Sequence, residues 1–268
     1  MSKTIVITGA SSGFGLQLAS ELHRKGFTVI GTSRKPQSYE SDVPFKLIKL
    51  DITDDNSIKQ FTNELFKLVS RVDVLINNAG CLLTGMAEET PIEQGKQQFE
   101  TNFWGTVKIT NALLPHFRNQ KYGHIITVSS IVGLIGPPNL SYYSASKHAV
   151  EGYFKALRFE LMPFNVQVSL VEPSWFRTNI GENAVAINKS ISDYDGYREK
   201  WIAFTNDGIK NAENPTRVTR LIHKIIDSKQ PPLKNLVGKM SGTIVFLQNY
   251  APKLFEKSML SQLTKAKT

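Results

Sequence analysis

Two side chains four positions apart, the phenol of Tyr143 and the ammonium of Lys147, could together move a proton. On a helix, residues at i and i+4 lie on one face, so these two groups would be neighbours. A nearby ammonium favours the phenolate and would lower the tyrosine pKa, which is about 10 in an unperturbed side chain. Tyr143 could then donate or accept a proton near neutral pH. Chance and helix packing also produce this spacing, so the rest of the chain has to supply a site around it.

A glycine-rich turn near the N-terminus is the second chemical pattern. The apolar run Lys3–Thr8 leads into Gly-Ala-Ser-Ser-Gly-Phe-Gly. Such glycines permit a tight turn and let backbone N–H groups approach a pyrophosphate, and the following helix adds its positive end. The spacing Gly-x-x-x-Gly-x-Gly differs from the common Gly-x-Gly-x-x-Gly fingerprint. We interpret the turn as a phosphate site, with a plain tight turn as the alternative; its candidate residues are Gly9, Ser11, Ser12, Gly13, Phe14 and Gly15.

The end of the second apolar run distinguishes two forms of a dinucleotide. A site for NAD would place an acidic residue there to hold the ribose 2′-hydroxyl. The chain has Thr-Ser-Arg-Lys over 32–35, so Ser33 and Arg34 could bind a 2′-phosphate instead. The sequence therefore favours NADP(H) over NAD(H), and an ordinary solvated loop is the alternative.

The residues that follow the third and fourth apolar runs could bind the same dinucleotide. Asp51 and Ile52 follow the third run, where the carboxylate could accept from an adenine amino group or could be an N-terminal helix charge. Asn78, Ala79 and Gly80 follow the fourth run, at the edge where parallel sheets bind ligands. The adjacent asparagines suggest hydrogen-bonded backbone support there, and a simple turn is the alternative.

Short apolar runs alternate with helical patterns along most of the chain, and this alternation sets the fold class. It means βαβ units, and therefore an α/β fold: a three-layer, doubly wound parallel sheet with helices on both faces. We expect the break in the helical stretch 91–119 near Gly95. The predicted strands are 3–8, 27–32, 45–50, 72–76, 124–129 and 165–171, and the predicted helices begin near residues 16, 54, 91 and 141.

The pattern weakens after residue 171. Residues 174–214 mix polar and aromatic side chains with no clean period except around 197–204, and so long an insertion is usually a lid or binding loop. A helix over 216–228 and a strand over 235–237 resume the fold. The tail 239–268 has apolar residues among lysines; we expect it to pack on the sheet edge, with a subunit or membrane contact as alternatives. No linker or repeat divides the chain, so we predict one domain over 1–268.

Length and composition agree with one domain and restrict its partners. The chain has 268 residues, 41% of them hydrophobic, and its net charge is 32 − 23 = +9. A basic protein can bind nucleic acid, an anionic membrane or a phosphorylated ligand, but no dense basic run with aromatics is present, so nucleic acid is not expected. Cys81 allows no internal disulfide, no run reaches the roughly 18 apolar residues of a membrane span, and the five histidines lack metal-ligand spacing. We expect a cytoplasmic protein without a metal.

These motifs together closely resemble the short-chain dehydrogenase/reductase family, in particular its single-domain branch with Thr-Gly-x-x-x-Gly-x-Gly and Tyr-x-x-x-Lys motifs. The resemblance covers Lys3 to about Thr178 and implies a Rossmann fold. Two departures are visible: Ser174 replaces a family glycine, and Ser12 stands where NADP-using members often have a basic residue. The resemblance assigns the catalytic set Asn102, Ser130, Tyr143 and Lys147, and it adds Pro173 and Thr178 to the cofactor contacts.

The resemblance also implies a reaction, the interconversion of a ketone or aldehyde and an alcohol with NADP(H). Tyr143 would exchange the proton, Lys147 would lower its pKa and hold the ribose, Ser130 would bind the reacting oxygen, and Asn102 would position a water. Apolar residues in 82–86, 131–140 and the 174–214 lid suggest a hydrophobic small-molecule substrate. Family members usually form homodimers or homotetramers. A non-catalytic NADP(H)-binding sensor is the alternative function.

Overall fold

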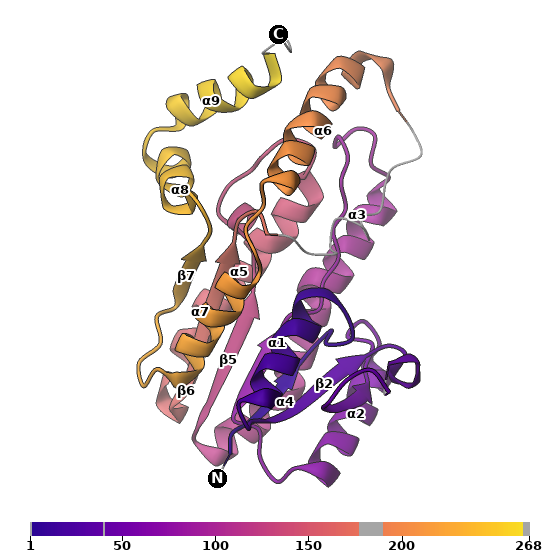
Figure 1. The fold of residues 1–268 in the computed structure, drawn as a ribbon, viewed down its shortest axis with the longest axis vertical. Coiled ribbons are helices and arrows are strands. Elements are labelled where there is room, and N and C mark those ends of the chain that lie inside the picture. The colour runs from indigo at the N-terminus through magenta and orange to yellow at the C-terminus, as the bar shows by residue number, and fades with distance from the viewer. Residues whose placement is uncertain (1, 40, 177–189, 265–268) are drawn as a thin grey trace.

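The computed structural model describes residues 2–39, 41–176 and 190–264, shown as a ribbon in Figure 1. Within these residues seven parallel strands form one sheet in the order β3-β2-β1-β4-β5-β6-β7. The order reverses direction between β1 and β4, which confirms the predicted doubly wound α/β fold. The strands are β1 (Thr4–Ile7), β2 (Thr28–Ser33), β3 (Lys46–Lys49), β4 (Val74–Asn77), β5 (Gly123–Val128), β6 (Val166–Pro173) and β7 (Lys234–Val237).

Helices cover both faces of the sheet and give it three layers. Helices α1 and α7 lie together on one face, as Figure 1 shows, while α2, α4 and α5 pack on the other. The α-helices are α1 (Gly13–Arg24), α2 (Asp55–Leu68), α3 (Ile92–Phe99), α4 (Thr106–Gln120), α5 (Ser141–Leu161), α6 (Asp195–Lys210), α7 (Thr216–Asp227), α8 (Ser241–Tyr250) and α9 (Pro252–Thr264). Short 3₁₀ helices occupy Pro36–Ser38, Ile131–Gly133, Met162–Phe164 and Ser192–Tyr194.

The two cores follow from the alternation of side chains along each strand. In β1, Val6 points to the α2–α4–α5 face, whereas Ile5 and Ile7 point to the α1–α7 face. Phe61 of α2 and Phe154 of α5 are completely buried in the first core. Burying one such side chain contributes about 1.5–3 kcal/mol, so these layers hold the sheet edge in a fixed geometry.

The helical stretch 91–119 is interrupted by a π-helical turn at Glu100–Gly105, between α3 and α4, and not at Gly95 as predicted. Gly95 lies inside α3, where an added Cβ would stand 2.3 Å from the Tyr142 ring on α5. The glycine is therefore required by the close approach of two helices, which a sequence pattern does not distinguish from a break. π-Turns often occur at functional sites, and this one contains Asn102.

The C-terminal third is more regular than its sequence pattern predicts. Helix α6 occupies much of the predicted 174–214 lid, and Trp201 is its one buried residue, which explains its weak periodicity. The tail forms α8 and α9. Helix α8 contacts the edge strand β7, as expected of the tail, whereas α9 packs on α6 and α8. Among the described residues, none of the helices combines the length and apolar character needed to cross a bilayer.

Candidate active site

The predicted site residues that the structure describes gather at one edge of the sheet, because every strand ends there in the same direction. This edge includes the point between β1 and β4 where the strand order reverses, the usual ligand site of such sheets. Thr178 lies outside the described residues. The others follow β1 (Gly9–Gly15), β2 (Ser33, Arg34), β3 (Asp51, Ile52), β4 (Asn78–Gly80), β5 (Ser130) and β6 (Pro173), or lie on α5 (Tyr143, Lys147) and in the π-turn (Asn102).

The turn after β1 is closely packed on itself. Gly9 and Gly13 have φ angles of 66° and 53°, the left-handed region that glycine adopts without strain. A Cβ on Gly15 would lie 2.2 Å from the Gly9 carbonyl oxygen and 2.4 Å from the Asn78 amide nitrogen. The third glycine of the motif is thus needed for contact between the turn, the start of α1 and the end of β4.

Thr8 and Asn78 join the ends of β1 and β4 by side-chain hydrogen bonds. The Asn78 amide donates to the Thr8 and Gly9 carbonyl oxygens, each at 3.0 Å. In return, the Thr8 hydroxyl accepts from the backbone N–H groups of Asn78 at 2.9 Å and Ala79 at 3.0 Å. The chain therefore has hydrogen-bonded support at this position rather than a simple turn. Thr8 was not among the predicted site residues, although its place before the first glycine is a signal.

The start of α1 has the features of an anion site. Its N-cap Ser12 makes no side-chain cap, and the first turn has no acidic residue. The helix therefore presents its positive end and unsatisfied N–H groups at the glycine turn. These features fit the phosphates of a dinucleotide.

The ends of β2 and β3 bring a cation and a carboxylate together. Arg34 is exposed, and Ser33 beside it is buried, with its hydroxyl accepting from the Lys35 N–H at 3.2 Å. Burial opposes ionisation of Asp51, but hydrogen bonds from Thr53 and the charge of Arg34 outweigh it and lower the pKa of the carboxyl. Asp54, and not Asp51, caps α2. Asp51 is thus an ionised carboxylate near the charge of Arg34.

The reactive pair meets Ser130 at the end of β5. The Ser130 hydroxyl is close enough to the Tyr143 phenol to affect its pKa. It accepts from the Val132 N–H at 3.3 Å and donates to the Pro173 carbonyl at 3.5 Å. Lys147 is one turn further along α5; its Nζ lies 5.9 Å from the Tyr143 ring centroid and donates to the Val128 carbonyl at 3.0 Å. Both side chains of the pair are buried. Together with Ser130 they form a compact set of proton donors.

Burial dominates the ionisation of this pair. It raises the pKa of Tyr143 to about 12, although the hydrogen bond to Ser130 partly opposes the rise. Burial also lowers the pKa of Lys147 to about 8, against the opposing charges of Cys81 and Glu151. The sequence-based prediction that Lys147 lowers the Tyr143 pKa is therefore wrong in direction for this arrangement. The reason is physical: the interior disfavours the charged form of both groups.

The side-chain amide of Asn102, in the π-turn, uses both its oxygen and its nitrogen in hydrogen bonds. Its Oδ1 accepts from the Cys81 N–H at 2.9 Å, and its Nδ2 donates to the Cys81 carbonyl at 3.0 Å and to the Ser146 hydroxyl at 3.3 Å. The Ser146 hydroxyl in turn donates to the Tyr143 carbonyl at 2.7 Å. Asn102 thus ties the loop after β4 to the first turn of α5.

Gln98, one turn before Asn102, supports the same loop and was missed by sequence reasoning. Its side chain is buried; Oε1 accepts from the Leu83 N–H at 2.7 Å, and Nε2 donates to the Cys81 carbonyl at 3.0 Å. The four-residue interval between Gln98 and Asn102 is the signal that could have identified it.

An apolar cluster covers the outer side of Tyr143. Leu82 from the loop after β4 and Phe204 from α6 pack against it, and Ile244 and Val245 contribute from α8. The side of the site away from the glycine turn is therefore hydrophobic. Its buried members are Ile131, Val132, Ile135, Leu140, Tyr143, Trp201 and Phe255.

Glu89, in the loop after β4, anchors the start of α6 beside this cluster. Its buried carboxylate pairs with Arg198 and accepts from the Ile191 N–H at 2.7 Å. Tyr194 donates to Glu88 at 2.9 Å next to it. These contacts fix how α6 presents Trp201 to the apolar cluster.

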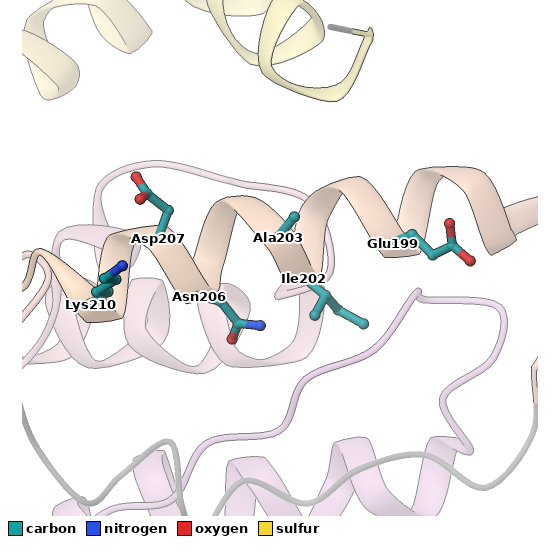
Figure 2. A pocket seen from close by; sticks show the side chains of 6 residues that line it. All are labelled: Glu199, Ile202, Ala203, Asn206, Asp207 and Lys210. Atoms are coloured by element: carbon teal, nitrogen blue, oxygen red, sulfur yellow. The ribbon is translucent and has the colours of Figure 1, made fainter. Parts of the chain in front are cut away.

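A cavity of about 530 Å³ lies on the opposite side of α6, and Figure 2 shows its lining side chains. The residues that line the cavity lie on the face of α6 roughly opposite Trp201 and Phe204. The cavity is therefore separate from the apolar cluster around Tyr143. Most of these residues are polar. The cavity is lined by Glu199, Ile202, Ala203, Asn206, Asp207 and Lys210.

Comparison with known proteins gives consistent matches. The family model described as short chain dehydrogenase matches residues 3–188. The 3-ketodihydrosphingosine reductase of Bacteroides thetaiotaomicron is 38% identical over 243 residues, covering 88% of this chain and 88% of that protein. Retinol dehydrogenase 8 of Bos taurus is 32% identical over 271 residues, covering 93% and 86% respectively.

Solved structures match over nearly the whole chain. A short-chain dehydrogenase from Streptomyces avermitilis has a TM-score of 0.83 at 31% identity, covering 99% of this chain and 100% of that one. ElxO with NADP bound has a TM-score of 0.75 at 26% identity, covering 91% and 100%. A protein from Burkholderia phymatum in complex with NAD has a TM-score of 0.80, covering 100% and 98%, and its 21% identity shows the shared fold alone.

Proposed function

Because the chain belongs to the short-chain dehydrogenase family, we propose that it is an oxidoreductase that uses NADP(H) to interconvert a ketone or aldehyde and an alcohol. One observation carries the proposal. The Tyr143 phenol, the Ser130 hydroxyl and the Lys147 ammonium come together at the sheet edge that also holds the glycine turn, with Lys147 Nζ 5.9 Å from the Tyr143 ring centroid.

Tyr143 is the proposed general acid. With its pKa raised to about 12, the phenol is protonated at neutral pH, and that is the form that donates a proton to a carbonyl oxygen. Ser130 donates a hydrogen bond to the same oxygen and polarises the carbonyl. General acid catalysis of this kind contributes about 10²–10⁴-fold to the rate. The protonation state therefore suits the reduction direction.

Lys147 is the proposed source of the replacement proton and a contact for the cofactor ribose. Its pKa of about 8 lets the ammonium exchange a proton near neutral pH. Asn102 keeps the first turn of α5 in place through Ser146, and we propose that it also positions the water that links Lys147 to solvent. The bound nicotinamide supplies or accepts the hydride, while the chain supplies orientation and electrostatics.

The preference for NADP(H) is proposed from the end of β2. Arg34 is exposed, and the residues directly after that strand, 34–39, include no carboxylate to hold a ribose 2′-hydroxyl. The ElxO structure carries NADP, whereas a neighbour of lower identity carries NAD, so the residues of this chain decide the proposal. The proposed cofactor contacts are Gly9, Ser11, Ser12, Gly13, Phe14, Gly15, Ser33, Arg34, Asp51, Ile52, Asn78, Ala79, Gly80, Tyr143, Lys147, Pro173 and Thr178.

The proposed substrate is hydrophobic. The apolar cluster that includes Tyr143 and Trp201 supports this, because it excludes water from one side of the phenol. Two relatives point the same way, since 3-ketodihydrosphingosine and retinol, which their names contain, are both largely hydrocarbon. A cytoplasmic location and a homodimer or homotetramer stay predictions.

The test is to mix the protein with NADPH and a panel of ketones and aldehydes of increasing chain length, and to follow nicotinamide absorbance. We expect turnover that rises with apolar length. NADPH binding without turnover on any member would instead favour a non-catalytic NADP(H)-binding sensor. A preference for small charged carbonyls would count against the hydrophobic pocket.

A further inference from the structure

Helices α8 and α9 lie at the β7 edge of the molecule (Figure 1), and several of their large apolar side chains are exposed. Phe246 and Tyr250 are 58% and 78% exposed, and their rings pair with centroids 5.2 Å apart. Met240, just before α8, and Leu254, in the first turn of α9, are 69% and 60% exposed. We call these four residues the C-terminal apolar surface. Single exposed apolar residues are common, but a group that includes a paired Phe and Tyr requires an explanation.

The opposite side of the same two helices is apolar as well. Ile244, Val245 and Leu247 of α8, and Phe255 and Met259 of α9, pack in the cluster that contains Tyr143. A helix that only covers a pocket in water needs one apolar face and one polar face. Helices α8 and α9 have apolar groups on both, so their outer side is suited to a second apolar environment.

The charged residues around the C-terminal apolar surface indicate which environment this surface contacts. Lys239, Lys253 and Lys257 are exposed and lie within three positions of Met240 or Leu254 along the chain, and Glu256 is the one acidic residue in the segment 239–261. Two copies related by a two-fold axis would bring these lysines close to one another, which is unfavourable. An anionic surface meets the same lysines with attraction, and the +9 charge of the chain adds to it.

We propose that the C-terminal apolar surface binds membranes that contain anionic lipids, with Phe246 and Tyr250 in the interfacial region and the lysines at the headgroups. Tyrosine is enriched at that depth because its ring is apolar and its hydroxyl is polar.

The consequence of this membrane contact for the substrate rests on the proposed function. Because α8 and α9 line the cluster around Tyr143 from the other side, a docked protein holds its pocket next to the lipid. A lipid-dissolved carbonyl then reaches Tyr143 without passing through bulk water. The substrate class is therefore a membrane lipid or a molecule that partitions into the bilayer.

The experiment is co-sedimentation of the full chain with vesicles of phosphatidylcholine alone and of phosphatidylcholine with phosphatidylglycerol. We expect binding to the anionic vesicles that is at least tenfold stronger and that weakens as salt is raised. The double variant Phe246→Ser/Tyr250→Ser should lose this binding, and Lys253→Glu/Lys257→Glu should lose its salt-sensitive part. Phe159→Ser, which changes an exposed phenylalanine on α5, is the matched control and should bind as the parent does.

Equal binding to both vesicle types, or anionic binding kept by the Phe246→Ser/Tyr250→Ser variant, would overturn the proposal. So would a change from dimer to monomer in that variant without any vesicle binding by the parent, since the surface would then be a subunit interface. Thermal unfolding and turnover of a water-soluble carbonyl should be unchanged in the variants. Vesicle binding is measured without NADPH, so its failure is distinct from a failure of the enzymatic function.

Discussion

Gln98 and Asn102 lie one helical turn apart and donate hydrogen bonds to the same atom, the carbonyl oxygen of Cys81. Their side-chain oxygens accept from the Leu83 and Cys81 N–H groups. The two side-chain amides thus form hydrogen bonds with the backbone of residues 81–83, as the backbone of a neighbouring strand would. The segment so held carries Leu82 into the apolar cluster around Tyr143. Gln98 is therefore a positioning residue for the substrate side of the site.

Replacing Gln98 by Leu should reduce kcat/KM by about tenfold, mainly through KM. The change removes two hydrogen bonds and leaves a buried N–H unsatisfied, a loss of about 1–3 kcal/mol. The Kd for NADPH should change less than KM, because Gln98 hydrogen-bonds Cys81 and Leu83, and neither is a proposed cofactor contact. Steady-state kinetics and NADPH fluorescence titration measure the two quantities.

Gln97→Leu is the matched control, since Gln97 is exposed on the same helix. If Gln98→Leu lowered only the melting temperature and kept the parental KM, the residue would be structural and not a positioning residue.

Replacing Tyr143 by Phe should lower kcat by about 10²–10⁴-fold, because it removes the proton donor and keeps the ring in the apolar cluster. NADPH binding and thermal stability should stay close to the parent. Tyr142→Phe is the control, since that ring packs against Gly95 of α3 and has no proposed role in chemistry. Substantial turnover by the Tyr143 variant would remove this residue from the mechanism.

Replacing Arg34 by Ala should weaken NADPH binding by about 10- to 100-fold, the loss expected for one charged hydrogen-bonding partner. NADH binding should change little, because it has no 2′-phosphate. Lys35→Ala tests whether any neighbouring cation would serve. Equal losses for both cofactors would show that Arg34 acts through the fold of the turn, for example through its charge near Asp51.

Glu172 gives the protein a distinctive dependence of stability on pH. It is completely buried at the end of β6, and its Oε2 accepts from the Asn235 N–H at 2.7 Å. Burial and the nearby charge of Glu151 raise its pKa from 4.5 to about 8. The folded state therefore binds this proton more tightly than the unfolded chain does. That stabilisation is complete below pH 4.5 and is lost as pH rises to about 8.

The isosteric variant Glu172→Gln should remove this dependence. Each unit of raised pKa corresponds to about 1.4 kcal/mol, so the parent should lose several kcal/mol relative to the variant between pH 5 and pH 8. Urea unfolding at intermediate pH values measures the difference. Glu160→Gln, at an exposed position of α5, should follow the parent. Parallel curves for the parent and Glu172→Gln would mean that Glu172 is ionised in the fold.

The parts of the fold that were predictable from sequence depend on local patterns. The helix bounds Ser141–Leu161 agree with the prediction, and the strands agree to within about two residues, because buried parallel strands are short apolar runs with sharp ends. Ser130, Tyr143 and Lys147 come together because their elements end at one sheet edge, which follows from parallel topology.

The parts that sequence did not predict depend on contacts between distant residues. The α6 start is held by Arg198 on Glu89, a pairing across more than a hundred positions. Gly95 marks a helix contact and not a break, because the Tyr142 ring fills its space. The ionisation of Tyr143 depends on how deeply the folded protein buries it, and spacing along a helix says nothing of burial.

The close packing of Gly15 against Gly9 and Asn78 also constrains the order of assembly. The turn after β1 has its Thr8 and Gly9 carbonyls bound by a side chain some seventy positions later in the chain. A nascent chain that has released only the first βαβ unit lacks that side chain, so its glycine turn is held by β2 alone, through the Gly9 and Ala10 N–H groups that donate to Thr32. The full set of hydrogen bonds at the glycine turn therefore requires β4 beside β1, so we expect the shape of the turn to depend on the docking of a segment far along the chain.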